Sequence, residues 1–321
     1  MEIPLLHIID YLVAKYLHHR DIPTHLTVKK IAALAGENKV HLAAYYSDAH
    51  KHYCRCKSLL KTGHLRDSAS YVEKENDLNE HLKQYLRNIA KDFFSVLTEY
   101  FVSNRRSKPV LSLRIPFVHD DDDYVYTIFR QNGNMLPPPF KVQDSQLLWK
   151  VRDTDSAQYC NNIPAMAGRR PTQFTHPRLR QECAQSYSRP LVERLRLRRR
   201  HGLDPGWNAC WIPVDPSQQQ ASPEHCYRSS LAAPVSIHSS EMPEVLRQTL
   251  GLDGDNVACI FGFLTVDSPE YRYFRASDHD VMALFCNFFT PFLLTQTIFT
   301  SSISRYHMPK QLSPCLDFLS G

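Results

Sequence analysis

The sequence predicts an α+β protein in which an N-terminal helical bundle and a long connecting helix precede an antiparallel sheet flanked by helices. Three observations support this class. Apolar residues recur at helical spacing over residues 4–50, they do so again over 77–102, and β-rich runs follow at 110–130, 227–238 and 257–266. The chain has 321 residues, of which 43% are hydrophobic, and is long enough for about two domains.

The first sixty residues have the periodicity of short helices. One apolar face runs through residues 4–19. Thr27 suits the N-cap of the next helix, and Gly36 ends that helix as a residue that takes positive φ easily. A third helix follows to about residue 50. The stretch from Thr27 to Tyr46 therefore predicts two helices joined by a tight turn.

A long helix is predicted from Asp77 to Val102, after a polar connection over residues 61–76. Its apolar stripe is wide enough to serve both a domain core and a partner helix, so we expect it to form a homodimer. The predicted domains are a helical domain at 1–60, a linker with the connecting helix at 61–107, a sheet domain at 108–303 and a tail at 304–321.

The sheet domain opens with a predicted hairpin formed by Val110–Val118 and Tyr124–Arg130. Four consecutive Asp residues form its tip. They lack the alternating ligand spacing of a calcium loop, so we expect a solvated turn. A short apolar element with Trp149 follows at Ser145–Val151.

Two more strands and a helix complete the sheet domain. Tyr227–His238 contains a Pro, which predicts a bent or edge strand. Val257–Val266 is almost continuously apolar, which predicts a central strand. Ser277 or Asp278 can begin a last helix that runs to about Phe299.

An arginine-rich stretch interrupts the sheet domain. Residues 169–201 contain ten Arg and two Glu, a net charge of +8, whereas the whole chain carries +5. We interpret residues 169–222 as a long insertion with some helix. One interpretation is a solvated basic insertion, and the other is a contact surface for anions or nucleic acid.

The cysteines and hydropathy indicate a cytoplasmic protein. Nine Cys form no regular framework, which favours a reduced compartment. His52, Cys54 and Cys56 lack the second ligand pair of a zinc site. No stretch approaches the ~20 apolar residues of a membrane span, so we expect no membrane association.

Three segments of residues 78–303 resemble a GAF domain. They are "LLWKVRDTDSAQYCNNIP", "YRSSLAAPV" and "VACIFGFLTVDSPEYRYFRASDHDVMALFCNFFTPFLL". The resemblance implies a central antiparallel sheet with helices on one side and a pocket on the other. It also implies a sensory role with a small-molecule effector of unknown identity. The sequence itself indicates no required cofactor.

The resemblance places ligand-binding candidates in the middle segment and the strand before the last one. Trp149 would stack on a flat ligand, and Arg228 would pair with a carboxylate or phosphate. The hydrogen-bonding candidates are Tyr159, Asn161, Asn162 and Ser230. For each of these residues, the alternative is a packing or turn role.

Two special forms of the family are weighed as alternatives. Bilin-binding members attach their chromophore through a Cys, and His225-Cys226 is the corresponding pair here, in reversed order. Free methionine sulfoxide reductases are GAF enzymes that use several Cys. That interpretation requires two thiols within disulfide reach, and its candidates are Cys160, Cys210, Cys226 and Cys259.

Residues 4–50 resemble the DNA-binding end of tetracycline-repressor-like regulators. The matching segments are "HIIDYLVAKYLHHRDI", "TVKKIAALAG" and "ENKVHLAAYYSD", which correspond to the three helices of a helix-turn-helix domain. This resemblance implies binding to double-stranded DNA through Asn38, Lys39, His41 and Tyr45. The alternative is a helical bundle that mediates dimerisation.

The sequence therefore predicts a dimeric, ligand-sensing GAF regulator that binds DNA and is not an enzyme. A GAF signalling module without DNA binding and a thiol-dependent reductase are the alternatives.

Overall fold

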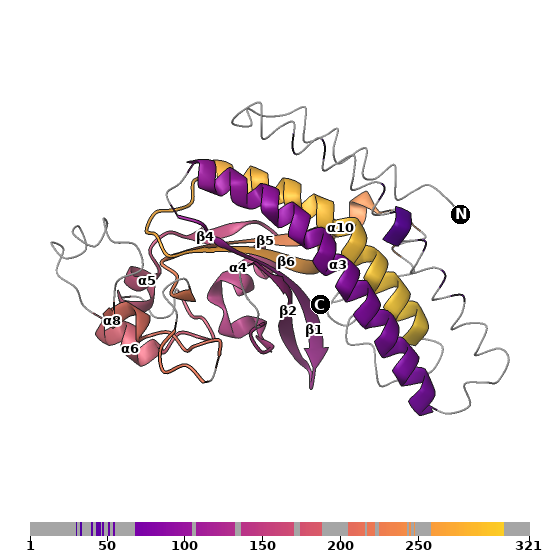
Figure 1. Cartoon of the computed structure of the whole chain (residues 1–321), viewed down its shortest axis with the longest axis horizontal. Coiled ribbons are helices and arrows are strands. Elements are labelled where there is room, and N and C mark those ends of the chain that lie inside the picture. The colour runs from indigo at the N-terminus through magenta and orange to yellow at the C-terminus, as the bar shows by residue number, and fades with distance from the viewer. Residues whose placement is uncertain are drawn as a thin grey trace. The chain divides into compact units, whose positions relative to one another are not determined.

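The computed structural model of the chain contains two compact units (Figure 1). The first is formed by Met1–Val96, Val235–Phe261 and Leu284–Gly321, and the second by Leu97–Pro234 and Gly262–Ala283. The structure describes residues 68–104, 107–131, 136–169, 174–187, 205–215, 217–221, 225–242 and 258–304, with isolated positions between 30 and 54 and at 244 and 247.

The sheet has six strands in the order β3-β2-β1-β6-β5-β4. The pairs β1–β2, β1–β6, β2–β3 and β4–β5 are antiparallel, which confirms the predicted α+β class with an antiparallel sheet. The strands are β1 Val110–His119, β2 Asp122–Arg130, β3 Phe140–Lys141, β4 Gln158–Cys160, β5 Ser229–His238 and β6 Ala258–Ser268.

The strand predicted to be central lies in the middle of the sheet. β6 is buried at every position from Cys259 to Ser268 and pairs with β1, where Leu111 faces Val266 and Leu113 faces Leu264. A strand covered on both faces is nearly continuous in apolar character, which is the pattern that predicted it.

The hairpin of β1 and β2 confirms the solvated acidic tip. Asp120 and Asp121 are exposed and take positive φ, as residues of a tight turn do. The next two carboxylates form ion pairs, Asp122 with Lys141 and Asp123 with Arg152. The tip is thus a turn held by basic side chains of the same unit.

Two long helices, α3 Ser68–Asn104 and α10 Ser277–Ser304, run side by side in Figure 1. Within the first unit, aromatic rings form their contact: Phe93 lies 5.1 Å from Phe289, and Phe94 lies 6.0 Å from the same ring, both edge-on. Such aromatic pairs add about 0.5–1.5 kcal/mol to their area burial. Both helices are longer than predicted. α3 already begins within the expected polar connection at 61–76, and α10 extends beyond Phe299.

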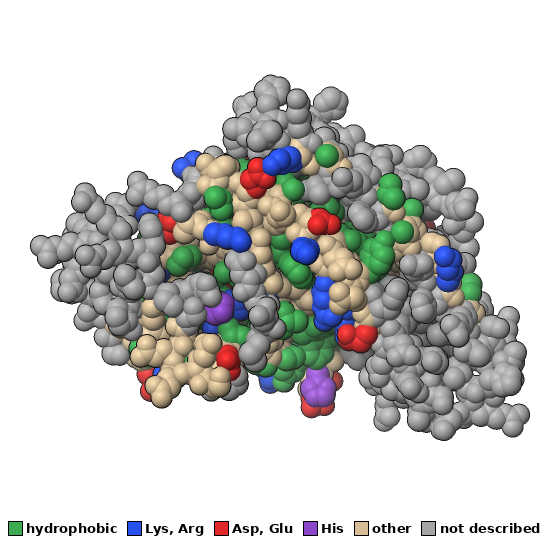
Figure 2. All heavy atoms as spheres, viewed as in Figure 1, with side chains coloured by type: hydrophobic (Ala, Val, Ile, Leu, Met, Phe, Trp, Pro, Cys, Tyr) green, Lys and Arg blue, Asp and Glu red, His purple; other side chains and the backbone are tan. Residues whose placement is uncertain are grey.

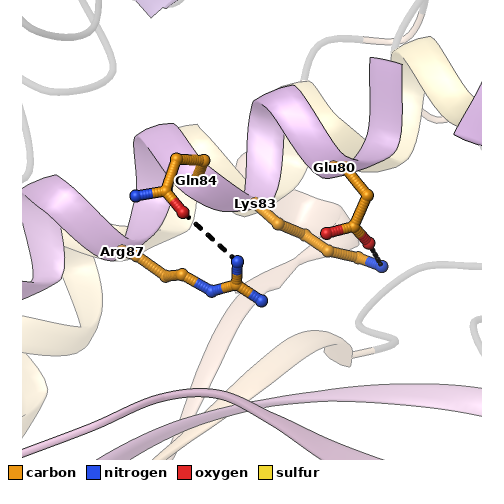
Figure 3. Close-up of polar contacts among 4 residues, drawn as sticks. All are labelled: Glu80, Lys83, Gln84 and Arg87. Atoms are coloured by element: carbon orange, nitrogen blue, oxygen red, sulfur yellow. Dashed lines mark hydrogen bonds and ion pairs between the residues drawn. The ribbon is translucent and has the colours of Figure 1, made fainter. Parts of the chain in front are cut away.

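The outer surface of α3 carries short-range polar contacts (Figure 3). Lys83 donates to Glu80 at 2.8 Å, and Arg87 donates to Gln84 at 3.3 Å. Pairs at this spacing contribute about 0.2–0.5 kcal/mol each to a helix. One side of α3 is therefore solvated, while Leu86, Phe93 and Leu97 are buried.

Part of the predicted insertion at 169–222 is a second hydrophobic core within the second unit. It joins α5 Ile163–Arg169, α6 Gln181–Ser186 and α8 Pro205–Asn208, which lie together in Figure 1. Trp207 and Trp211 are completely or almost completely buried there. These described residues are packed, since the two Trp rings bury apolar surface together with Leu179 and Tyr227. The basic run at 189–200 lies outside the described residues, so the solvated-insertion interpretation of it stays a prediction.

A disulfide between Cys183 and Cys210 connects α6 to the end of α8. The sequence-based expectation of reduced cysteines does not hold for this pair. The Cα atoms lie 5.2 Å apart, in the usual range for a disulfide.

The remaining short elements are α4 Gln146–Thr154, which confirms the apolar element with Trp149, and two 3₁₀ turns, η1 Val142–Asp144 and η4 Ser239–Glu241. Among the described residues, no helix is both long and apolar enough to cross a membrane.

Candidate functional site

The second unit contains an arginine-lined cavity. Its volume is about 560 Å³, within the range of small-molecule sites. None of the residues that line it is acidic. The lining residues are Arg114, Arg130, Pro137, Pro138, Pro139, Phe140, His176, Pro177, Arg178, Arg180, Ile212, Pro213, Val214, Gln218, Gln219 and Tyr227.

Two of the arginines come from adjacent strands. Arg130 of β2 pairs with Ser112 of β1, and Arg114 lies two residues further along β1. Residues two apart on a strand share a face, so both guanidinium groups start from the same side of the sheet. The register shifts between Leu113 and Arg114, and such an irregularity re-aims side chains.

Arg114 is a buried cation that forms no hydrogen bond with any described residue. Its side chain is only 7% exposed, and its Nε is buried without an acceptor. The ring of Phe140 lies 5.3 Å from the guanidinium carbon. Burial lowers the pKa of Arg114, and Asp267 opposes that effect. Arginine remains charged at neutral pH despite such a shift, so a buried positive charge without a hydrogen-bonding acceptor lies at the cavity wall.

Arg130 is also buried, and its guanidinium is only partly occupied. One terminal nitrogen donates to the hydroxyl of Tyr227, and the guanidinium also lies 5.9 Å from the centre of the Tyr227 ring. Its Nε has no acceptor among the described residues. The guanidinium of Arg130 therefore retains N–H donors for the oxygen atoms of a ligand.

Arg178 is held in position by the segment after α8. Its Nε and one terminal nitrogen donate to the carbonyl of Ile212 at 3.1 and 2.8 Å. The backbone amide of Ile212 donates in return to the carbonyl of Arg178 at 2.8 Å. These reciprocal hydrogen bonds fix the orientation of the guanidinium in the protein without a ligand.

Burial shifts the pKa of three polar neighbours of these arginines toward their neutral forms. Burial lowers the pKa of His176 well below its usual value, and the three arginines act in the same direction. Its Nδ1 accepts a hydrogen bond from the backbone amide of Arg178 at 3.1 Å, which only an unprotonated Nδ1 can do. Burial also raises the pKa of Tyr227 and of Asp267, despite the opposing effect of nearby arginines. The cavity thus has a strong positive potential.

The six ligand-binding candidates from the sequence do not line this cavity. Tyr159, Asn161 and Asn162 line a separate cavity of about 300 Å³ beside α4 and β4. Trp149 is 42% exposed and lines neither of these two cavities. Its ring lies 5.7 Å from the guanidinium carbon of Arg152.

Arg228 and Ser230 have structural contacts around β5. Arg228 donates to the carbonyl of Pro269 at 3.1 Å and lies over the ring of Tyr271. The hydroxyl of Ser230 donates to Asp267 at 2.5 Å. These contacts correspond to the packing alternative for both residues.

Asn161 fastens the loop that precedes α10. Its amide nitrogen donates to the carbonyl of Phe274 at 2.7 Å, and its amide oxygen accepts from the backbone amide of Phe274 at 2.9 Å.

Asn161→Ala should lower the free energy of unfolding by about 2–3 kcal/mol, because both backbone groups lose their partner. Urea denaturation measures this loss of stability. Asn162→Ala is the control, because the side chain of Asn162 accepts a single hydrogen bond, from the backbone amide of Ala165. Equal stability of both variants would contradict it.

Most of the DNA-binding candidates lie outside the described residues. This holds for Asn38, Lys39 and His41 and for the larger part of the helix-turn-helix at 4–50. Tyr45 is described and fully buried, with its ring 5.4 Å from Tyr85 and 5.5 Å from Phe292. A side chain in that position packs within the first unit. The same helical stretch exposes Val40, Ala43, Ala44 and Ser47, which offer few donors to base edges.

The described basic side chains form no continuous patch on the face drawn in Figure 2. The described Lys and Arg residues on this face lie mostly apart, among neutral and hydrophobic side chains. A surface that follows a phosphate backbone requires several adjacent cations.

The thiols considered for catalysis or chromophore attachment differ in state, and one of them, Cys210, lies within disulfide reach of Cys183. Burial raises the pKa of Cys226 to about 12, and burial also raises the pKa of Cys160. Cys259 is buried inside β6, and Cys210 is in the disulfide. Among the described residues, no three His, Cys, Asp or Glu side chains gather as metal ligands do.

Comparisons with known proteins give little further information. No family model matches the chain, and no curated protein sequence is significantly similar to it. The chain has a weak structural likeness to a type II free methionine-R-sulfoxide reductase from Thermoplasma acidophilum, at a TM-score of 0.32 and 9% identity. The match covers 66% of this chain and 94% of that one. A likeness of this strength carries no argument about fold family or activity.

The cavity arginines were missed by sequence reasoning, although one signal pointed to them. Arg114 interrupts the apolar run "VLSLRIPF", and a charge inside a buried strand is rare unless it has a role. Arg178 was seen only as one member of the basic stretch.

Proposed function

We propose that the chain is a ligand-sensing protein whose sheet unit is a GAF-like domain that binds a small anionic molecule in the arginine-lined cavity. The antiparallel sheet flanked by helices, with a cavity over one part of it, supports this role. Ligand sites of this kind combine an apolar wall with a few fixed polar groups. Here Phe140 and the prolines supply the wall, and the arginines supply the polar groups.

The main support for this proposal is that Arg114 is buried and its Nε has no hydrogen-bonding partner. Burying a cation without a partner costs several kcal/mol, so buried charges in proteins are normally paired. Arg114 has no hydrogen-bonding partner among the described residues, and the cavity that it lines contains no carboxylate. An anion in the cavity would supply the missing acceptor.

Anions should stabilise the protein through this site. In chloride buffer, we expect phosphate, sulfate, succinate or citrate to raise the melting temperature, since a ligand at 100 times its Kd adds about 2.7 kcal/mol to the free energy of unfolding. Arg114→Met should remove the effect and still fold, because an apolar side chain of similar length fills the same space.

The matched control is Arg275→Met, which removes an exposed arginine of the same unit. It should keep the anion response of the wild type. Absence of stabilisation by all four anions, or an equal response in Arg114→Met, would overturn the proposed function.

We extend this proposal to a dimeric regulator that passes ligand binding to an output such as DNA binding, as the sequence predicts. Tyr45 packs on Tyr85 and Phe292 inside the first unit, and this contact supports a connection from the predicted recognition helix to α3 and α10. The same contacts suit a signalling module without DNA binding.

A further inference from the structure

We infer that the anion bound in the arginine-lined cavity is a dianionic phosphate monoester carried by a small organic molecule. The inference rests on the proposed function and narrows its ligand class. It follows from the number of guanidinium groups, the separate chain segments that carry them and the space beside them.

The unoccupied donors belong to three separate segments of the chain. Arg114 comes from β1 and offers its whole fork, and Arg130 comes from β2 with one nitrogen engaged. Arg178 comes from the loop before α6 and has two of its nitrogens on Ile212. Each fork matches a pair of oxygens on a carboxylate or phosphate.

A tetrahedral anion satisfies this arrangement better than a planar one. The two oxygens of a carboxylate lie in one plane, and a single guanidinium in the bidentate geometry occupies them both along one edge. A phosphate monoester presents three terminal oxygens in three directions. The whole guanidinium of Arg114 and the remaining donors of Arg130 and Arg178, from three chain segments, therefore have separate oxygens to bind.

The charge balance also favours a dianion. The lining contains four arginines, of which Arg114, Arg130 and Arg178 are buried, and no acid. Asp267 is the nearby carboxyl group that acts on Arg114, and it also accepts a hydrogen bond from the hydroxyl of Ser230. A monoanion would leave most of this positive charge uncompensated, whereas a phosphate monoester carries about −1.5 to −2 at neutral pH.

The rest of the cavity has room for an organic group. A volume of about 560 Å³ exceeds that of one phosphate several-fold by ordinary molecular dimensions. Phe140, Ile212 and Val214 give this part an apolar wall, and Gln218 and Gln219 add exposed amides at its edge. Such surroundings suit a small phosphorylated molecule with an apolar or ring-shaped body.

The test compares three probes of the same ring size by calorimetry on the full chain in chloride buffer. Phenyl phosphate is the dianionic monoester, methyl phenyl phosphate the monoanionic diester and benzoate the planar monoanion. We expect phenyl phosphate to bind at least ~10-fold more tightly than either of the others, since one extra charge-assisted hydrogen bond is enough for that ratio.

Variants tie the preference to the cavity. Arg114→Met should weaken the binding of phenyl phosphate at least ~10-fold. Arg114→Lys should weaken this binding less, because it keeps the charge. Arg275→Met should leave the affinity unchanged. Arg178→Met provides a second variant if Arg114→Met does not fold.

The outcomes separate the two proposals. If benzoate binds as tightly as phenyl phosphate and both depend on Arg114, the phosphate inference is overturned while anion binding stands. If none of the probes or simple anions binds, both proposals are overturned. Binding of a phosphoserine peptide without phenyl phosphate would indicate a protein partner and would also overturn the inference.

Discussion

Removing the disulfide between Cys183 and Cys210 should lower the free energy of unfolding by about 3–4 kcal/mol. The two cysteines are 27 residues apart, so the bridge closes a sizeable loop in the unfolded chain. Restricting that loop removes conformational entropy from the unfolded state, and the loss of this restriction favours unfolding. The Cys183→Ala/Cys210→Ala variant shows the effect without added reductant.

Urea denaturation of the wild type and the double variant measures this change. Cys160→Ala is the matched control, because Cys160 lies in the same unit outside the disulfide. The reduced wild type should unfold close to the double variant. A loss below about 1 kcal/mol in both would show that the two sulfur atoms do not form a stabilising bridge.

The same bridge lies beside the cavity wall. The carbonyl of Cys210 accepts a hydrogen bond from the backbone amide of Arg180 at 2.8 Å, and Ile212 holds Arg178 two residues later. The short pairing of Leu179 with Trp211 lies between these contacts. Loss of the bridge therefore acts on the segment that positions one cavity arginine.

The sequence predicted those elements whose pattern is set by their own residues. The hairpin of β1 and β2 follows from β-rich runs around a polar tip, and β6 from an uninterrupted apolar run. The two long helices follow from apolar residues at helical spacing. Their ends were missed, because the first turns of α3 contain polar helix formers such as Glu73 and Lys74 and lack an apolar face.

The cavity could not be predicted in the same way, because it is a property of the tertiary structure. Arg114, Arg130 and Arg178 have no common motif, and only the pairing of β1 with β2 and the reciprocal hydrogen bonds at Ile212 bring them to one cavity. The candidates taken from the GAF resemblance are polar residues in plausible segments. Their hydrogen bonds, such as those of Asn161 with Phe274, hold loops in place.

Acidification should destabilise the protein as the pH falls from about 6.5 to 4, mainly through His225 and His176. Burial, with Arg130 and Arg178 nearby, lowers the pKa of His225 from 6.5 to about 4. Burial and the arginines also lower the pKa of His176 well below 6.5. In this range the unfolded chain binds protons at both imidazoles that the folded protein does not bind.

The sign follows from the lowered pKa of both groups. Above a pH of about 6.5 both histidines are neutral in either state, so their contribution to stability is complete and constant. Below a pH of about 6.5, each histidine lowers the free energy of unfolding by up to about 1.4 kcal/mol per pH unit. His225 alone lowers it by up to about 3 kcal/mol at pH 4. Asp267 opposes this loss, because burial raises its pKa and the folded protein then takes up a proton earlier.

Comparison of variants isolates the histidines from Asp267. We expect His176→Asn/His225→Asn to show a shallower loss of stability between about pH 6.5 and 4 in urea titrations. The amide side chain introduced at position 176 would still offer an oxygen to the backbone amide of Arg178. His119→Asn, at the exposed hairpin tip, is the control for loss of a histidine. Equal slopes for the double variant and the wild type would contradict the prediction.

A bound anion should change this behaviour in a specific way. Protonation of His176 in the empty cavity is opposed by three buried cations and breaks the hydrogen bond from Arg178. A negatively charged phosphate group in the same cavity offsets those cations, so the pKa of His176 rises and the folded protein binds its proton nearer to the pH of the unfolded chain. Saturating phenyl phosphate should therefore flatten the acid loss in the wild type and leave it unchanged in Arg114→Met. A wild-type curve that keeps its slope while the ligand is bound would place the anion away from His176.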